Sequence, residues 1–223
     1  MKKHLITVAT AVTLALPALS QAAPLRQGGY VSGFLGVSAP RNSETNGIDF
    51  FNSNGASFNE QVDFDPGIYV GGTGGYNFGF FRLEGELSYR HAEINSISNG
   101  TFRNPDGNLG ALAVMGNAFF DLRNSTPVTP YWGGGVGFAS LHLSDTYGTD
   151  SLGRTLVYAG DTDTVFAYQA GAGLEIALNR QLSLDLGYRY FGTSTARFGA
   201  NKDITTDLKL ESHNGAVGLR VKF

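Results

Sequence analysis

The sequence predicts an all-β protein: an eight-stranded antiparallel transmembrane β-barrel with short periplasmic turns and four long extracellular loops. Three observations support this prediction. Glycine supplies 31 of 223 residues, about twice the usual share, without the Gly-X-Y period of collagen. Apolar and polar side chains alternate along several segments, which is the period of a strand. Charged residues make up only 16% of the chain, below the ~25% of typical soluble domains, which favours a non-aqueous environment.

Composition also excludes several kinds of protein. The chain contains no cysteine, which excludes disulfide scaffolds, cysteine-ligated zinc and thiol catalysis. Its formal net charge is -3, so no basic excess is available to neutralise phosphates, and we expect no nucleic-acid partner. After residue 22, no uninterrupted apolar run reaches the roughly 18 residues of a membrane helix. Any membrane crossing must therefore use strands.

The first residues predict export. Two lysines precede an apolar stretch, Leu5–Leu16, and the small-x-small pattern Ser20–Ala22 follows it. We therefore expect residues 1–22 to be a secretory signal peptide and residues 23–223 to be one β-barrel domain. The alternative is a membrane-anchoring helix. A stretch of this length rises only about 18 Å, however, which is short of a ~30 Å hydrocarbon core.

The strands are predicted from the alternation of side chains. It is clearest in four segments: 80–91, 164–178, 182–190 and 212–223. In the first, the odd positions from 81 to 89 are apolar or glycine, and the even positions from 82 to 90 are polar or charged. The second runs for about 15 residues, far beyond the usual ~5–6 of a soluble strand. We expect the apolar faces to point outward and the polar faces inward.

Four weaker segments complete the count. They carry more glycine and less charge: 30–38, 64–76, 109–121 and 130–143. In the third we expect Asn117 to face inward, whereas in the first either face could be the apolar one. Eight strands use the sequence fully, because ten would have to consume two long polar connections that lack alternation.

The connections alternate in length. Three are short, namely 77–79, 122–129 and 179–181, and four are long, namely 39–63, 92–108, 144–163 and 192–207. Short turns at one end and long loops at the other are typical of bacterial outer-membrane barrels. The sheet must close because an edge strand cannot satisfy its backbone groups in lipid. The alternative is a periplasmic sandwich with the apolar residues in its core.

Aromatic residues near the strand ends are expected to form two interfacial girdles. These residues are Phe80, Phe81, Tyr89, Phe120, Trp132, Tyr188, Tyr190 and Phe223.

Several segments resemble a known family, the opacity-protein-like "porin family" of small outer-membrane β-barrels. The resemblance is carried by residues 129–137, 166–175, 182–191 and 218–223. It implies an eight-stranded barrel in the cell outer membrane. It also implies that Gly218, Val221 and Phe223 form the signal read by the barrel-assembly machinery. The family includes adhesins, immune-evasion antigens and proteins without a known activity.

Nine charged residues are expected inside the barrel. They are Arg82, Glu84, Glu86, Arg90, Glu175, Asp185, Arg189, Arg220 and Lys222. Five positive and four negative charges nearly cancel. Because side chains fill an eight-stranded barrel, we expect a plug of paired charges. The alternative is a gated ion path, which would make the protein a narrow passive pore.

Two constellations resemble catalytic sites. Glu84 and Glu86 share one face, but the neighbouring Arg82 favours the ionised form of both and argues against a glycosidase pair. His142 and Ser144 resemble the His-x-Ser element of outer-membrane lipid A deacylases, in which a histidine activates a serine. The residues that follow do not match that family. We therefore expect no enzyme, and keep the lipid A-modifying hydrolase as an alternative.

Neither a cofactor nor a metal is expected. The glycine runs 71–75 and 133–137 match no phosphate-loop pattern and are interpreted as close contacts within strands. Four aspartates in one loop could bind calcium, but their spacing is not that of an EF-hand. They are Asp145, Asp150, Asp161 and Asp163.

The function expected from the sequence is a non-catalytic outer-membrane barrel with a structural or surface-interaction role. Its expected partners are outer-membrane lipid and lipopolysaccharide, the barrel-assembly machinery, and a host or surface ligand bound by the loops. Loop contacts are assigned to exposed aromatic residues: Phe50, Phe51, Phe58, Phe102, Tyr147 and Phe198.

Overall fold

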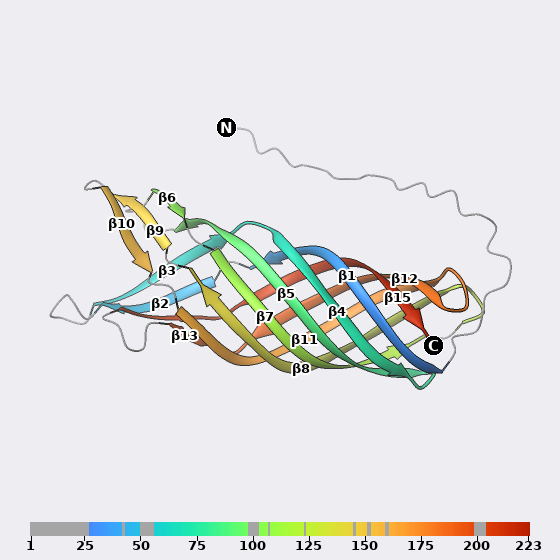
Figure 1. Cartoon of the computed structure of the whole chain (residues 1–223). Coiled ribbons are helices and arrows are strands. Elements are labelled where there is room, and N and C mark those ends of the chain that lie inside the picture. The colour runs from blue at the N-terminus through green and yellow to red at the C-terminus, as the bar shows by residue number, and fades with distance from the viewer. Residues whose placement is uncertain are drawn as a thin grey trace.

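Eight long antiparallel strands close into a barrel (Figure 1). The computed structural model describes residues 27–41, 43–49, 56–97, 103–106, 108–122, 124–144, 146–150, 153–158, 161–198 and 204–223. The barrel strands are β1 (Gly28–Pro40), β4 (Gly67–Asn77), β5 (Phe81–Ile97), β7 (Asn108–Asp121), β8 (Val128–Leu143), β11 (Asp161–Ala177), β12 (Leu182–Thr193) and β15 (Glu211–Lys222). The predicted signal peptide, residues 1–22, lies outside the described residues.

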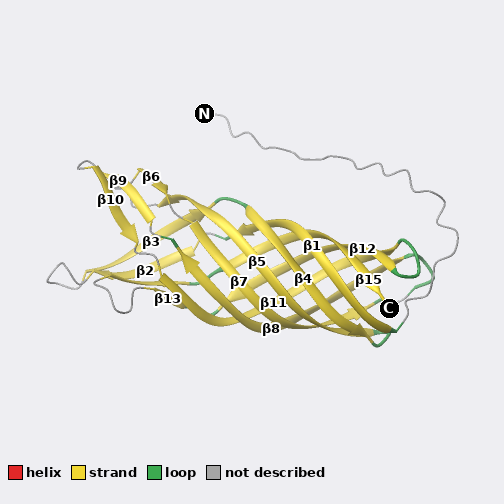
Figure 2. Cartoon of the chain, in the orientation of Figure 1, coloured by secondary structure: helices red, strands yellow, loops and turns green. Residues whose placement is uncertain are grey.

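The barrel is closed by pairing between its first and last strands. Each of the eight strands pairs with the next, and β15 pairs with β1 from Tyr30↔Lys222 to Pro40↔Ser212. The predicted eight-stranded barrel is confirmed, and the sandwich alternative is wrong because no barrel strand is left as an edge. The described residues form strands joined by loops and turns (Figure 2). No helix among them is long and apolar enough to cross a membrane.

Short connections link the strands at one end, called the turn end here, and long ones at the other, called the loop end. The long connections contain further strands that the sequence analysis did not predict. They are β2 (Ser43–Asp49), β3 (Ala56–Phe64), β6 (Arg103–Asp106), β9 (Thr146–Asp150), β10 (Gly153–Tyr158), β13 (Ala196–Phe198) and β14 (Ile204–Leu208). A strand that lies beyond the membrane does not need an apolar face, so its sequence need not alternate between apolar and polar residues.

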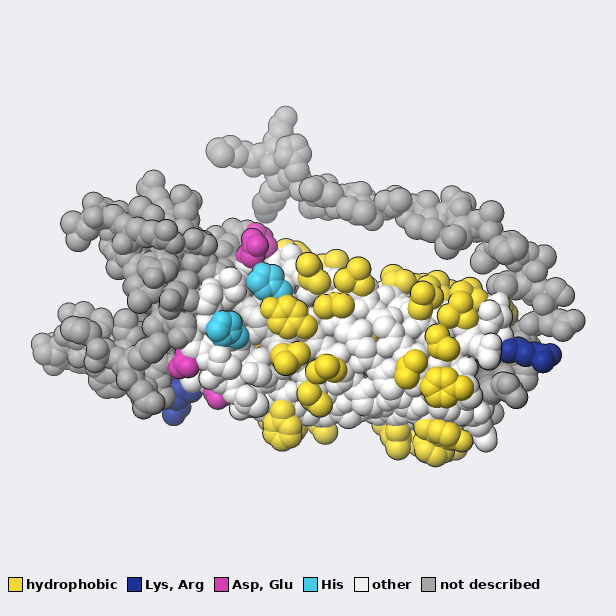
Figure 3. All heavy atoms as spheres, in the orientation of Figure 1, with side chains coloured by type: hydrophobic (Ala, Val, Ile, Leu, Met, Phe, Trp, Pro, Cys, Tyr) yellow, Lys and Arg dark blue, Asp and Glu magenta, His cyan; other side chains and the backbone are white. Residues whose placement is uncertain are grey.

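The outer wall of the barrel is apolar and its interior is mostly polar in the half near the turns. Along β5, Leu83 and Leu87 are about half exposed on the wall, whereas Arg82 and Glu86 are buried inside. The sequence of β1 allowed either face to be the apolar one. In the structure Val31, Leu35 and Val37 face outward. Asn117 faces inward as predicted. Apolar side chains cover much of the visible wall between the two ends (Figure 3).

Aromatic residues are exposed on the wall toward both ends. Phe80, Phe120, Trp132 and Phe223 lie at the turn end, and Tyr89, Tyr188 and Tyr190 lie farther toward the loop end. Phe81 is partly covered and stacks on Phe78, with 4.7 Å between ring centroids. This arrangement is that of the interfacial girdles of membrane barrels.

The glycines of β8 allow the inward-facing side chains of β7 to lie against the β8 backbone. Gly133, Gly135 and Gly137 face the interior beside bulky side chains of β7. A Cβ at Gly135 would clash with Asn117 Oδ1 and with the Gly116 carbonyl oxygen. Glycine is needed here because the neighbouring side chains and backbone occupy the space that a methyl group requires.

We therefore expect Gly135→Ala to destabilise the barrel by about 1–3 kcal/mol, the usual cost of overpacking. The outward-facing Gly74 provides a matched control, because a Cβ there has no heavy atom within 4 Å. Urea titration of both variants in lipid vesicles, followed by heat-dependent gel mobility, measures the difference. Equal stability of the two variants would contradict this account.

Candidate functional site

The barrel interior holds ten charged side chains that form one network. The nine charged residues predicted for the interior all lie there, and Asp121 at the end of β7 joins them. With Asp121, five cations face five carboxylates. The same alternation that places Asn117 inside also places Asp121 inside, so the sequence carried a signal for it.

The centre of the network is built around Glu86 on β5. Arg189 from β12 forms ion pairs with Glu86 and, at 3.2 Å, with Glu84. Gln169 donates to Glu86 Oε2 at 2.8 Å and to Asn117 Oδ1 at 2.7 Å. Asn117 donates to Glu86 Oε2 at 3.1 Å. Both carboxylates are thus occupied by cationic and amide donors, an arrangement that does not favour acid–base catalysis.

A second group lies at the turn end on β5, β7 and β8. Arg82, which is 0% exposed, forms an ion pair with Asp121, and Asn77 donates to the other Asp121 oxygen at 2.9 Å. The Arg82 guanidinium carbon lies 4.1 Å from the ring centroid of Tyr131 and 5.0 Å from that of Phe119. Cation–π contacts and an ion pair together compensate the burial of this charge.

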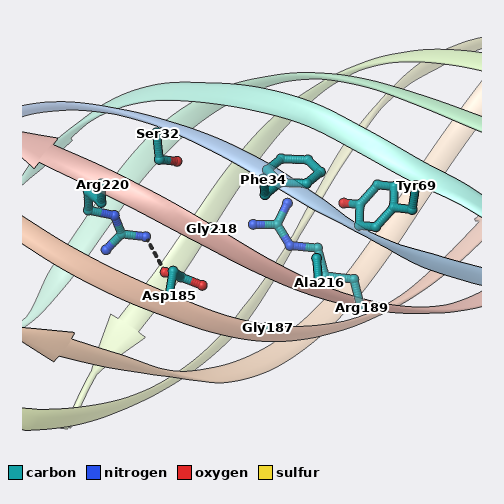
Figure 4. Close-up of a pocket in the computed structure, with 9 residues that line it drawn as sticks. All are labelled: Ser32, Phe34, Tyr69, Asp185, Gly187, Arg189, Ala216, Gly218 and Arg220. Atoms are coloured by element: carbon teal, nitrogen blue, oxygen red, sulfur yellow. Dashed lines mark hydrogen bonds and ion pairs between the residues drawn. The ribbon is translucent and has the colours of Figure 1, made fainter. Parts of the chain in front are cut away.

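The third group is centred on two cations of the last strand, β15. Arg220 pairs with Glu175 and, at 2.7 Å, with Asp185, while Lys222 pairs with Glu175. Tyr131 donates to the second oxygen of Asp185 at 2.6 Å. Figure 4 shows Arg220 and Asp185 facing each other across neighbouring strands. These contacts tie β8, β11, β12 and β15 together inside the barrel.

A small cavity lies beside this group (Figure 4). It has a volume of about 20 Å³ and is lined by residues that include Ser32, Phe34 and the two arginines Arg189 and Arg220. This is room for about one water molecule. The paired side chains therefore leave no wide passage at this level.

Arg90 lies at the side of the network that is nearest the loop end. Its guanidinium carbon is 3.9 Å from the ring centroid of Phe191 and 4.5 Å from that of Tyr69. Arg90 donates to Ser88 at 3.0 Å and lies 4.0 Å from Glu86. It is the point at which the polar interior changes to an apolar one.

An apolar cluster packs inside the loop end of the barrel, and the alternation in the sequence did not predict it. Its members come from β7, β8, β11, β12 and the connection that carries β13 and β14: Leu109, Ala111, Ala113, Met115, Ala139, Leu141, Leu143, Val165, Ala167, Phe191, Ala196, Phe198, Leu208 and Leu210. Phe198 is 1% exposed, so its expected role as an exposed loop aromatic is wrong. The β13 strand buries it against side chains of the barrel. The described interior therefore contains two layers of side chains, one charged and one apolar.

The other expected loop aromatics lie outside the part of the chain whose side chains are described. These are Phe50, Phe51, Phe58, Phe102 and Tyr147.

The two residues of the lipid A hydrolase alternative bond to other groups. His142 Nδ1 lies 2.8 Å from Thr162 Oγ1, and Ser144 Oγ accepts a hydrogen bond from the Asn108 amide at 2.8 Å. A histidine that activates a serine must instead lie within hydrogen-bond reach of it. This geometry gives no support to a catalytic pair.

No cluster of three metal-binding side chains occurs among the residues whose positions are described. Of the four candidate calcium ligands, Asp145 and the side chain of Asp150 lie outside that part of the chain. Asp161 accepts from the Thr162 amide, and Asp163 accepts from the Arg197 amide.

The three residues of the expected assembly signal lie on β15 and at the C-terminus. Gly218 is buried against β1, whereas Val221 and Phe223 are 44% and 75% exposed at the turn end. Their part in assembly stays a prediction.

The comparison with known families decides the classification. Residues 7–223 match the family model described as outer membrane protein beta-barrel domain. The chain belongs to this family. Its members occupy the outer membrane, so membrane lipid surrounds the apolar wall of this barrel.

Relatives and solved structures agree with this classification. The outer membrane protein PagN of Salmonella typhimurium is 25% identical over 205 residues, covering 82% of each chain. Uncharacterized proteins of Brucella abortus and Brucella suis are 34% identical over 101 residues, which is 44% of this chain, and the match spans only 35% of their length.

Two solved structures share the fold of this family member. OprG of Pseudomonas aeruginosa has a TM-score of 0.67 at 12% identity, covering 90% of this chain and 98% of its own. Neisserial surface protein A has a TM-score of 0.52 at 18% identity, covering 88% and 97%. Both likenesses are in fold alone.

We expect Glu86→Gln to cost about 3 kcal/mol of stability, because it leaves the buried charge of Arg189 without its principal partner. The double variant Glu86→Gln/Arg189→Met is expected to lose less than the two single variants together. Urea unfolding in vesicles measures this coupling. The control is Asp207→Asn, which breaks an exposed ion pair with Arg197 and is expected to cost less than about 1 kcal/mol. Strict additivity of the interior variants would contradict the pairing.

Proposed function

We propose that this outer-membrane barrel is non-catalytic, that its interior is closed to solutes, and that it acts through the strands it presents at the cell surface. The observation that supports the proposal is the presence of two layers of side chains in the interior, which we interpret as a double seal. Five cations and five carboxylates pair within the turn-end half, and an apolar cluster packs the loop end.

Each layer of the seal opposes ion passage for a different reason. In the charged layer, an entering ion must displace a partner from a buried pair, which leaves an uncompensated charge. In the apolar layer, it must give up its hydration without receiving polar contacts in return. The two layers lie in series along the barrel.

The surface role is supported by the strands beyond the loop end. The hairpin of β2 and β3 pairs with β14 on one side and, through β3, with β5 on the other. The strands β6, β9 and β10 form a separate three-stranded sheet. Figure 1 shows both groups extending from one end of the barrel. A host or surface ligand bound there, and recognition of the C-terminus by the assembly machinery, are part of this proposal.

The closed interior predicts silence in planar-bilayer recordings of the refolded chain 23–223, with insertion verified by heat-dependent gel mobility. Glu84→Ala is expected to lower stability and to stay silent as well, since the apolar cluster remains in place. Discrete, reproducible conductance steps from wild type would favour the passive pore instead. Steps from Glu84→Ala alone would identify the charged layer as a gate.

The surface role predicts that replacing residues 50–55, which connect β2 to β3, with a glycine–serine segment of equal length weakens attachment of expressing cells to host or abiotic surfaces. The hairpin pairing from Asp49↔Ala56 onward is kept. Surface biotinylation checks that both forms reach the cell surface in equal amount. Unchanged attachment at equal display would count against this hairpin as the contact.

A further inference from the structure

A cluster of two cations around one carboxylate lies on the outer wall at the loop end, outside the network already described. Arg41 follows β1, and Lys209 precedes β15, whose first residue is Glu211. Arg41 Nη1 lies 3.3 Å from one Glu211 oxygen, and Lys209 Nζ lies 2.7 Å from the other. The cluster therefore carries a net charge of about one positive unit.

Both cations are exposed to solvent, where a further anion can reach them. The side chain of Arg41 is 60% exposed and that of Lys209 is 49% exposed, whereas Glu211 is 22% exposed. A guanidinium has five N–H donors and an ammonium has three, so either group can bond to more than one acceptor oxygen. The hydrogen bond to Glu211 and its negative charge raise the pKa of the Lys209 ammonium group, which keeps it charged.

An aromatic group continues the cluster toward the membrane. The ring of His213 lies 5.4 Å from Tyr190 and 6.1 Å from Tyr188, and His213 Nδ1 lies 2.6 Å from the Tyr188 hydroxyl. Tyr168 lies 6.4 Å from Tyr190. Tyrosines gather at the level of lipid headgroups in membrane proteins. These rings therefore mark the outer interface on β11, β12 and β15.

The position of the cations relative to these rings indicates the partner. Glu211 lies two residues beyond His213 along β15, a rise of about 7 Å on a strand and less along the membrane normal of a tilted one. The headgroup layer extends roughly 5–7 Å beyond the hydrocarbon core. Arg41 and Lys209 thus lie where the phosphate groups of the outer leaflet are found.

We propose that Arg41 and Lys209, which lie on either side of the Glu211 carboxylate, bind a phosphate group of lipopolysaccharide in the outer leaflet. The tyrosines Tyr168, Tyr188 and Tyr190 contact the glycolipid below the phosphate. Two cations from different chain segments provide charge-assisted hydrogen bonds to one anion. This inference rests on the outer-membrane location and is independent of the proposed role of the surface strands.

The chain offers a matched control. Arg197 is also exposed at the loop end, but its Nε lies 3.0 Å from Asp207 in a one-to-one ion pair between β13 and β14. Removing Arg197 changes the net charge as much as removing Arg41 does. The contacts of Arg197 are with Asp207 and Asp163, and they do not involve the aromatic group on β11, β12 and β15.

The test is native mass spectrometry of the refolded barrel titrated with bisphosphorylated lipid A. Arg41→Gln/Lys209→Gln is expected to weaken binding about tenfold or more, the factor implied by losing a charge-assisted hydrogen bond to phosphate. Glu211→Gln is expected to strengthen binding, because both cations lose their competing carboxylate. Arg197→Gln is expected to leave binding unchanged, and all variants are checked for folding by heat-dependent gel mobility.

Four outcomes would contradict the proposal. One is equal weakening by Arg197→Gln, which would indicate net charge without a site. Another is equal binding of lipid A from which the phosphates have been removed, which would leave only acyl-chain contact. The third is displacement of lipid A by inorganic phosphate at similar concentration, which would indicate a general anion site. Weaker binding of Glu211→Gln in a folded barrel would also contradict the assigned charge arrangement.

Discussion

The structure depends on one constraint: within lipid, every backbone amide and carbonyl of a strand needs a partner from another strand. This constraint requires β15 to pair with β1, and it fixes the barrel at a width that side chains must fill. The interior glycines of β8 follow from that width. At Gly135 even a methyl group would meet Asn117 and the backbone of the neighbouring strand. Membrane crossing thus dictates packing at positions that never contact lipid.

The same constraint inverts the usual distribution of side chains and leaves a polar interior that must neutralise itself. Burial of isolated charges in a low-dielectric wall would be prohibitive, so cations and carboxylates occur together. Arg82 and Arg90 also lie against aromatic rings, which lowers the cost of burying them. Toward the loop end from Arg90, apolar side chains of β7, β8, β11 and β12 pack against one another. The interior therefore combines a membrane-barrel network with a small core of the kind found in soluble proteins.

The sequence was informative wherever the membrane imposes a rule on each residue. Lipid on one side of a strand enforces strict alternation, so the barrel strands and the inward position of Glu86 and Arg189 could be predicted. The same rule predicts the inward position of Asp121 at the end of β7. It does not predict the burial of Phe198, because that burial depends on where β13 lies relative to the barrel, and local periodicity does not encode that position. The hairpins beyond the loop end were not predicted, because a strand with water on both faces needs no alternation of apolar and polar residues.

The position of two cations on the final strand links charge balance to completion of the chain. Without β15, three interior arginines would face five carboxylates, among them Glu175 and Asp185, which bond to Arg220 and Lys222. The unfinished barrel would thus have both an open seam and an unbalanced acidic lumen. Docking of the last strand corrects both defects in one step. Among the described interior residues, a barrel without β15 would therefore keep two carboxylates more than cations, and the two cations of the last strand supply the missing positive charges.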